Sequence, residues 1–299
     1  MYDLLVIGAG AAGMAAALSA WENGVEKILL ADRNDRLGGI LPQCIHNGFG
    51  LGRFHEDLTG PEYAARYIEF VRGTGVEIRL DTFVLELSSD KTAVLSSPDG
   101  VEKISFRACV LATGCRERPI GSLPVAGSRP AGVFTAGTAQ KMVNLGGYDI
   151  GREIVILGSG DIGMIMARRF AINGCHVRAI VEIEDHLGGL VRNQKNCIEA
   201  YSIPVMLSST VTRVHGEARV TGVTVRHLDT GAEEFISCDT LITAVGLIPE
   251  RELAAGLEPL PEWLRACGNC DFIHEIVDAV SSQAEAVGRD TASYLRDNS

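Results

Sequence analysis

Short apolar runs alternate along the chain with stretches in which small and apolar residues recur at helical spacing. The N-terminal case begins with the run Leu4–Ile7, continues through a glycine-rich turn and a small-residue helical pattern, and ends with a second apolar run that stops at Asp32. The same order recurs from Ile154–Leu157 to Glu182. Strand, helix and strand in this order predict two βαβ units, and therefore an α/β fold with parallel sheets.

These two segments form an internal repeat. Residues 3–39 and residues 153–189 each carry the motif GxGxxG directly after the first apolar run. In both copies the first glycine precedes the acidic residue by 24 positions and a Gly-Gly pair by 30 positions. A single GxGxxG is weak evidence, but a preceding strand, a following helix and an acid at this distance make it specific. We call Gly8–Gly13 the first glycine loop and Gly158–Gly163 the second glycine loop.

This arrangement suits the diphosphate of a dinucleotide. The first glycine permits a tight turn, the second lets the diphosphate approach the backbone, and the third lets the helix pack on the strand. The helix N-terminus offers free N–H groups, and the acid accepts hydrogen bonds from a ribose diol. Two repeats therefore predict two dinucleotides, most simply FAD and NAD(P). The expected contacts are Gly8, Gly10, Ala11, Ala12, Gly13, Asp32, Gly38 and Gly39 in the first repeat, and Gly158, Gly160, Asp161, Ile162, Gly163 and Glu182 in the second.

The rest of the chain agrees with this plan. Residues 59–75 predict a helix with Thr59 as its cap and a glycine at its end. Residues 76–111 and 219–246 alternate as short strands separated by polar turns. The stretch CGNCDFIHEIVDAV (267–280) predicts a small-residue turn that leads into an amphipathic helix. Further expected cofactor contacts in the strand ends and in this turn are Ala112, Thr113, Gly114, Gly246, Gly268 and Asn269.

The first repeat is assigned to FAD because the FAD-type segments VLATG (110–114) and CGNC (267–270) accompany it. The second repeat then takes the nicotinamide nucleotide. Glu182 would bond a ribose 2′-hydroxyl and repel a 2′-phosphate, and the residues that follow it are acidic, which favours NAD(H) over NADP(H). Asp161 lies inside the second loop, close to the expected phosphates, so we expect its carboxylate to point away from them or to cap the helix.

Composition sets outer limits on function. The chain has 299 residues, a length typical of about two domains. Its formal net charge of −11 argues against nucleic acid and anionic membrane surfaces as partners. Outside the N-terminal repeat, no apolar run approaches the roughly 20 residues of a membrane helix. The eight cysteines are scattered, which differs from a secreted disulfide framework, so reduced thiols and a cytoplasmic location are expected.

With these motifs the chain resembles the pyridine nucleotide–disulfide oxidoreductases of the thioredoxin-reductase size class over nearly its whole length. The resemblance implies two Rossmann-like (βαβ) dinucleotide-binding domains, with the NAD(P)-binding domain inserted into the FAD-binding domain. The implied FAD domain comprises residues 1–118 and 244–299, and the implied NAD(P) domain comprises residues 119–243. The segments VLATG and LITAVGLIPE (241–250) mark the two crossings.

A narrower resemblance rests on the segments GGILPQCIHNGFG, TGPEYA, ATGCRERP, GVFTAGTAQ, ILGSGDIGMIMARR and CGNCDFIHEIVD. They are similar to bacterial oxidoreductases related to opine and proline dehydrogenase alpha subunits, the hydrogen cyanide synthase flavoprotein and glycerol-3-phosphate-dehydrogenase-associated proteins. This implies electron transfer between NADH and FAD and on to a partner dehydrogenase subunit, a quinone or a small molecule, within a homo- or hetero-oligomer. Two alternatives stay open: a self-contained NADH oxidase or disulfide reductase that uses Cys44, and a subunit that retains nucleotides without catalysis.

The segment GGILPQCIHNGFG (38–50) places Cys44 and His46 two positions apart. In the families that the chain resembles, this segment runs alongside the flavin ring, so both residues are candidate catalytic groups. Three interpretations of Cys44 stay open. It could be a redox thiol stabilised as thiolate by His46 and the flavin, or a small residue packed under the flavin while His46 acts as acid or base. It could also be inert packing, with His46 hydrogen-bonded to backbone groups. A metal site is not supported because a second pair of ligands is missing.

Two further features near the C-terminus carry alternatives. Cys267 and Cys270 form a CxxC that is either a redox pair or a turn in which Asn269 bonds a ribityl hydroxyl, the reading that the resemblance favours. His274 and Asp278 lie four positions apart on the expected helix and can pair on one face. If that face meets the flavin, His274 is a candidate for handling a proton; otherwise the two form a solvated pair.

Overall fold

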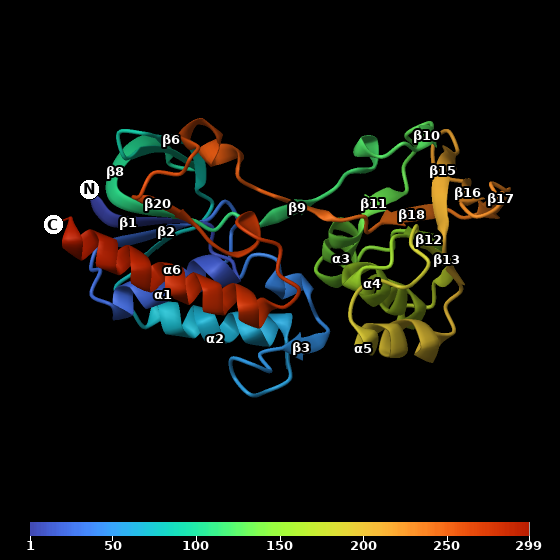
Figure 1. Ribbon diagram of the computed structural model, residues 1–299, viewed down its shortest axis with the longest axis horizontal. Coiled ribbons are helices and arrows are strands. Elements are labelled where there is room, and N and C mark those ends of the chain that lie inside the picture. Colours follow the sequence, from blue (N-terminus) through green and yellow to red (C-terminus); the bar gives the residue numbers. More distant parts are fainter. Residues whose placement is uncertain (299) are drawn as a thin grey trace. The chain divides into compact units, whose positions relative to one another are not determined.

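The computed structural model describes residues 1–298. The chain divides into two compact units: the first unit is Met1–Arg116 together with the segment that begins at Ile248, and the second unit is Glu117–Leu247. The strands β9 (Cys115–Glu117) and β19 (Leu247–Pro249) carry the chain from one unit to the other and pair with each other. In sequence, the second unit is thus inserted between two segments of the first (Figure 1).

The first unit is built on a parallel sheet that continues into an antiparallel meander. The parallel strands run in the order β5-β2-β1-β8, with β20 also paired to β8, and the long β8 then pairs with β7 and β7 with β6. Its strands are β1 (Tyr2–Ile7), β2 (Ile28–Ala31), β5 (Glu77–Arg79), β6 (Phe83–Ser88), β7 (Thr92–Ser97), β8 (Gly100–Leu111) and β20 (Leu264–Ala266). The central strand β1 is apolar throughout Leu4–Ile7 because both of its faces are buried.

Three helices lie together on one face of this sheet: α1 (Ala11–Glu22), α2 (Gly60–Arg72) and α6 (Val277–Asp297) (Figure 1). The small residues of α1 follow from this packing, since a Cβ on Gly288 of α6 would lie 2.5 Å from the carbonyl oxygen of Ala16. The other face packs against the meander and Trp263. Shorter elements are β3 (Asn47–Phe49), β4 (Leu58–Thr59), and the turns η1 (Leu41–Gln43), η5 (Glu252–Leu257) and η6 (Gly268–Cys270).

The predicted helix after residue 59 is confirmed as α2. Thr59 is its N-cap, and the backbone N–H of Thr59 donates to the Glu62 carboxylate at 2.8 Å while the Thr59 hydroxyl accepts from the Glu62 N–H. This reciprocal capping box satisfies two N–H groups that a helix start otherwise leaves free. The helix ends at Arg72, with Gly73 as its C-cap.

The prediction of a turn that leads into a helix within residues 267–280 is partly wrong, because the helix begins later than expected. Residues 268–270 form the short turn η6, and α6 begins only at Val277. The segment between them does not continue as a helix because the Asn269 carboxamide oxygen accepts the backbone N–H of His274 at 3.0 Å, a local side-chain bond that competes with helical pairing. His274 therefore precedes the helix instead of lying on it.

The second unit repeats the layered plan. Its parallel sheet has the order β11-β18-β12-β13-β14 and is covered on one face by helices and on the other by a second sheet of order β10-β15-β16-β17. The strands are β10 (Ala126–Gly127), β11 (Val133–Thr135), β12 (Glu153–Leu157), β13 (His176–Val181), β14 (Val205–Met206), β15 (Ser209–His215), β16 (Gly222–His227), β17 (Glu233–Ser237) and β18 (Thr240–Thr243). The helical elements are η2 (Ile120–Ser122), α3 (Ala136–Asn144), α4 (Asp161–Ile172), α5 (Val191–Asn193), η3 (Gln194–Ile198) and η4 (Glu199–Tyr201). The predicted α/β fold with Rossmann-like sheets is confirmed.

Candidate functional site

The first glycine loop connects β1 to α1, and its glycines meet different surroundings. Gly8 has φ +102°, and a Cβ there would overlap the carbonyl oxygen of Ala112. A Cβ on Gly13 would overlap the carbonyl oxygen of Gly8. At Gly10, in contrast, the nearest atom to an added Cβ is the Gly39 Cα, 3.8 Å away. The first and third glycines are thus required by backbone packing, while the second borders free space at the start of a helix.

The second glycine loop, between β12 and α4, shows the same three environments. Gly158 has φ +99°, and a Cβ there would overlap the Ala244 carbonyl oxygen. A Cβ on Gly163 would lie 2.6 Å from the Gly158 carbonyl oxygen. A Cβ on Gly160 would have no atom within 4 Å among residues 1–298 other than those of Gly160 and its chain neighbours. Both loops therefore leave room for a diphosphate at the second glycine, beside the free N–H groups of a helix start.

The acid of each repeat is buried and bonded to its own glycine loop. Asp32 is 6% exposed; its Oδ2 accepts the Ala9 N–H at 2.6 Å and its Oδ1 accepts two bonds from Asn34, each of 2.8 Å. A carboxylate has about four acceptor positions, so one position on Oδ2 stays open. A ribose hydroxyl can donate a hydrogen bond to this open position.

Glu182 is 8% exposed and repeats this arrangement. Its Oε2 accepts the N–H and the hydroxyl of Ser159 at 2.8 and 2.6 Å, and its Oε1 accepts the Glu184 N–H at 3.0 Å. One of its roughly four acceptor positions therefore stays open on Oε1. The spacing of the repeat predicts the position of both acids, but not their bonds to Ala9 and Ser159.

The other expected contact residues lie at strand ends and at the starts of the two helices. Ala112, Thr113 and Gly114 follow β8 directly beside the first glycine loop, since the Ala112 N–H donates to the Ile7 carbonyl at 2.8 Å. Gly246 belongs to the second unit and has φ +104°. Ala11 and Ala12 open α1, and Ile162 lies in the first turn of α4. Asp161 opens α4, but its carboxylate turns to the Leu190 N–H and the Asn193 carboxamide, at 2.8 and 2.7 Å.

The η6 turn lies against the start of α1. Gly268 has φ +67°, and a Cβ there would lie 2.6 Å from the Ala12 Cβ. Its N–H donates to Gln283 Oε1 at 2.8 Å, and the same oxygen lies 2.9 Å from Nε2 of His274. Because an amide oxygen only accepts, this contact requires the His274 proton on Nε2. Gln283 is the residue that sequence reasoning missed, since nothing in the local pattern separates it from other polar residues of an amphipathic helix.

The expected pair of His274 and Asp278 is not formed. Asp278 Oδ2 accepts the Gly52 N–H at 3.1 Å, and His274 is bonded to Gln283. The two residues are not on a common helical face, because α6 starts after His274. The helical spacing that suggested the pair applies only within a helix.

Cys44 and His46 lie in different environments. Cys44 is 9% exposed, its thiol lies 3.5 Å from the Ile40 carbonyl oxygen, and burial raises the pKa of this thiol to about 12. The half-buried ring of His46 has Nδ1 2.9 Å from the Asn47 carbonyl oxygen and its centroid 5.0 Å from that of Phe49. These contacts favour packing for Cys44 and backbone bonding for His46.

Cys267 and Cys270 are both buried and reduced. The Cys270 thiol donates to the carbonyl oxygens of Leu111 and Cys267, at 3.1 and 3.2 Å. Burial raises the pKa of both thiols, most strongly that of Cys267. These surroundings are those of structural cysteines, because reactive ones need a partly exposed and electropositive environment.

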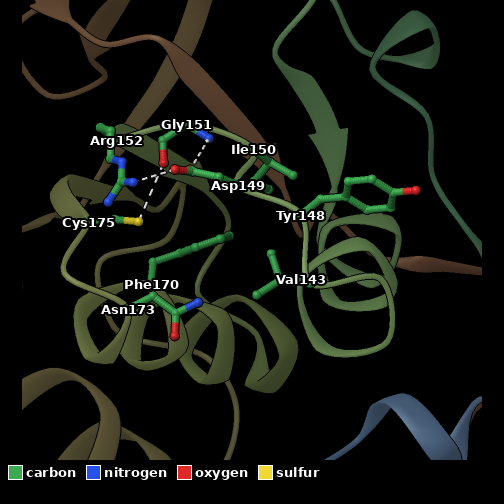
Figure 2. A pocket seen from close by; sticks show the side chains of 10 residues that line it. Val143, Tyr148, Asp149, Ile150, Gly151, Arg152, Phe170, Asn173 and Cys175 are labelled. Carbon is green, nitrogen blue, oxygen red and sulfur yellow. Dashed lines mark hydrogen bonds and ion pairs between the residues drawn. The ribbon is translucent and has the colours of Figure 1, made fainter.

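A cavity of about 250 Å³ opens at the amino ends of strands β12 and β13 in the second unit, the end opposite the second glycine loop (Figure 2). It is lined where the chain enters β12 and β13, by residues that include the ion pair of Asp149 with Arg152 and the Cys175 thiol, which donates to the Gly151 carbonyl at 3.4 Å. Dinucleotides bind at the carboxyl ends of such strands. This cavity lies at the amino ends and is separate from the second glycine loop.

Two features are absent from residues 1–298. None of their helices combines the length and apolar character needed to cross a bilayer. Nor do their His, Cys, Asp and Glu side chains form a group of three or more that could hold a metal ion.

Known proteins are similar to this chain in sequence and in fold. Thioredoxin reductase of Mycolicibacterium smegmatis is 27% identical over 263 residues, which cover 86% of this chain and 79% of that protein. Hydrogen cyanide synthase subunit HcnB of Pseudomonas protegens is 29% identical over 185 residues, which cover 60% of this chain and 38% of HcnB. The crystal structure of Lactococcus lactis thioredoxin reductase matches with a TM-score of 0.77 at 19% identity, and the match covers 99% of this chain and 98% of that one.

The resemblance inferred from the motifs is thereby confirmed. Residues 2–261 match the family described as pyridine nucleotide-disulphide oxidoreductase. With two preserved glycine loops, each beside a buried carboxylate, the chain belongs to this family and is an oxidoreductase whose cofactors are FAD and NAD(P)H.

Proposed function

We propose that this chain transfers electrons between NADH, held at the second glycine loop, and FAD, held at the first, and exchanges them with an acceptor or donor outside the chain. The observation that carries the proposal is the free space at Gly10 and Gly160, each beside a carboxylate that keeps one open acceptor position. Cofactor chemistry needs no protein nucleophile: FAD supplies a ring that exchanges hydride with nicotinamide. The protein's part is to bind, orient and exclude water.

Each unit supplies its own set of groups for this task. In the first unit, the start of α1 and Asp32 would hold FAD, and the η6 turn with Asn269 lies against the same helix start. His274 carries its proton on Nε2 toward Gln283 and is the candidate for proton handling. In the second unit, the start of α4 and Glu182 would hold the nicotinamide nucleotide.

The proposal leaves thiol chemistry out. At neutral pH, a thiol with a pKa of about 12 is almost entirely protonated, so Cys44 has little thiolate to attack a substrate. Thioredoxin-reductase-like enzymes carry CxxC in the nicotinamide unit, whereas Cys175, Cys197 and Cys238 of the second unit are far apart in sequence. The electrons therefore need an acceptor or donor other than a disulfide of this chain.

A partner dehydrogenase subunit is the acceptor or donor that the comparisons support best. HcnB is named as a subunit of hydrogen cyanide synthase, and this chain spans 38% of its length. A protein that forms part of an assembly can receive its electrons from, or deliver them to, a neighbouring chain. A quinone or a small molecule is the alternative that the same redox chemistry allows.

The preference for NADH rests on charge. Glu182 is a buried carboxylate at the end of β13, and Glu184 and Asp185 follow it. A 2′-phosphate brought to this strand end would meet the negative charge of Glu184 and Asp185, and residues 183–189 hold no Lys or Arg. The one histidine among them, His186, has its Nδ1 2.7 Å from the Asp185 carboxylate. The 2′-hydroxyl of NADH would instead donate to the open position of Glu182.

Anaerobic stopped-flow absorbance tests the proposal. The FAD-loaded chain is mixed with NADH or NADPH, and bleaching of the flavin band is followed in wild type and in Cys44→Ser. We expect faster bleaching with NADH, at the same rate in both proteins, and turnover with an artificial dye but without an organic substrate. Loss of turnover in Cys44→Ser with FAD still bound would instead establish the single-cysteine enzyme. No bleaching with either nucleotide would refute NAD(P)H oxidation by this chain.

A further inference from the structure

The Gly-Gly pairs that follow the two repeats are held in different ways. In the first unit, Leu37 and Gly38 are buried, and the Gly38 N–H donates to the Ala9 carbonyl at 2.9 Å. Apolar packing and a backbone bond thus close this segment onto the first glycine loop. In the second unit the counterpart residues Leu187 and Gly188 are only partly buried, so packing holds them less firmly.

In the second unit, side-chain oxygens hold this segment against the glycine loop. The Ser159 hydroxyl accepts the Gly188 N–H at 2.8 Å. One carboxylate oxygen of Asp161 accepts both the Leu190 N–H, at 2.8 Å, and the Asn193 carboxamide, at 2.7 Å. Residues 187–193, which we call the closing segment, are therefore tied to the second glycine loop by three hydrogen bonds to two side chains.

The first repeat has no equivalent of these side chains. The positions of Ser159 and Asp161 are occupied there by Ala9 and Ala11. The difference is therefore a property of the second loop and not of the fold that both units share. It also means that alanine at these positions is compatible with this type of loop.

The closing segment borders the groups that would meet the nucleotide. A Cβ on Gly189 would lie 2.9 Å from the Asp161 nitrogen, and one on Gly188 would lie 3.7 Å from the Gly160 nitrogen. The same Ser159 hydroxyl donates to Glu182 at 2.6 Å. One hydroxyl thus joins the acid expected to bind the ribose to the segment that lies beside the helix start.

We propose that Ser159 and Asp161 are positioning residues for the nicotinamide nucleotide, which they serve by holding the closing segment and Glu182 in the geometry that the bound nucleotide meets. This inference rests on the proposed function, which places that nucleotide in the second unit. A carboxylate beside a diphosphate opposes its binding by Coulomb repulsion. The hydrogen bonds of Asp161 to the closing segment offset this repulsion, because they hold the segment in place beside the nucleotide.

Titration of the FAD-loaded chain with NADH, followed by steady-state kinetics with an artificial dye, tests the inference. Asn193→Ala removes one bond to Asp161, and Asn196→Ala is its matched control, an exposed asparagine of the same stretch. We expect Asn193→Ala and Asp161→Ala to raise Kd and KM about tenfold, which corresponds to about 1.4 kcal/mol, with kcat within about twofold. Asn196→Ala should leave all three values unchanged.

Two further variants separate hydrogen bonding from charge. Asp161→Asn keeps an oxygen acceptor but loses the charge, so it should return Kd to within about threefold of wild type. Ser159→Ala copies the first loop and should weaken NADH binding while FAD absorbance stays unchanged. These readouts distinguish positioning from a general loss of structure, because a folding defect would lower kcat and FAD content as well.

Several outcomes would overturn the inference. Equal effects of Asn193→Ala and Asn196→Ala would remove the role of the closing segment. Binding in Asp161→Asn as weak as in Asp161→Ala would show that charge, and not hydrogen bonding, is what matters. Wild type that binds neither NADH nor NADPH refutes the proposed function itself, a result that the first titration gives before any variant is compared.

Discussion

Alanine at the second glycine of the second loop separates nucleotide binding from folding. Gly160 has φ −60° and ψ 167°, a conformation open to any residue, and beyond its chain neighbours an added Cβ would meet no atom of the described chain within 4 Å. Gly160→Ala should leave the free energy of unfolding unchanged or raise it by about 0.4–1 kcal/mol, because alanine restricts the unfolded chain. The same methyl group enters the space expected for the diphosphate of the nucleotide.

The first glycine of the same loop is the matched contrast. Gly158 has φ +99°, and its Cβ would overlap the Ala244 carbonyl oxygen. The left-handed conformation alone costs alanine roughly 1–2 kcal/mol, and overlap with backbone costs about 1–3 kcal/mol more. A loss of at least about 2 kcal/mol corresponds to a fall in Tm of roughly 4–8 °C for a domain of this size.

The assay combines an NADH titration with thermal unfolding of both variants. An added methyl in a close-fitting site costs about 1–3 kcal/mol, so Gly160→Ala should raise the Kd for NADH roughly 10- to 100-fold at unchanged Tm. Gly158→Ala should lower Tm. Wild-type affinity in Gly160→Ala, or an equal fall in Tm in both variants, would refute the reading of the second glycine as the one that faces the nucleotide.

Three further predictions address charge, capping and burial. Glu182→Gln removes the charge that opposes a 2′-phosphate, so the ratio of kcat/KM for NADPH to that for NADH should rise about tenfold; an unchanged ratio in dye-reduction assays would contradict this. Thr59→Ala removes the α2 cap and should lower the free energy of unfolding by about 1 kcal/mol in urea titrations. An unchanged urea midpoint would argue against that cap. Burial raises the pKa of Cys44 from 9.0 to about 12, so the stability it contributes is complete below pH 9 and is lost as pH rises toward 12. Over that range wild type should lose unfolding free energy more steeply than Cys44→Ala, by up to about 1.4 kcal/mol per pH unit; parallel curves would count against the burial of this thiol.

The sequence by itself determined the local geometry of the two glycine loops. Gly8 and Gly158 take positive φ, and the helix starts, the second glycines and the acids follow at the intervals that the repeat predicts. The cap of α2 was also predictable, since Thr59 and Glu62 lie three positions apart. Turns and caps depend on residues within a few positions of each other, so a single sequence carries enough information to place them.

Only the tertiary structure decided which partners the chemical groups find. Asp278 bonds Gly52, which is 226 positions away, and His274 bonds Gln283 instead of the Asp278 that helical spacing suggested. Likewise, the raised pKa of Cys44 comes from its burial, which no local motif encodes. Burial and hydrogen-bond partners depend on which segments the fold brings together, and that information is spread over the whole chain. The repeat therefore predicts where the dinucleotides bind, while packing decides which side chains around them are reactive.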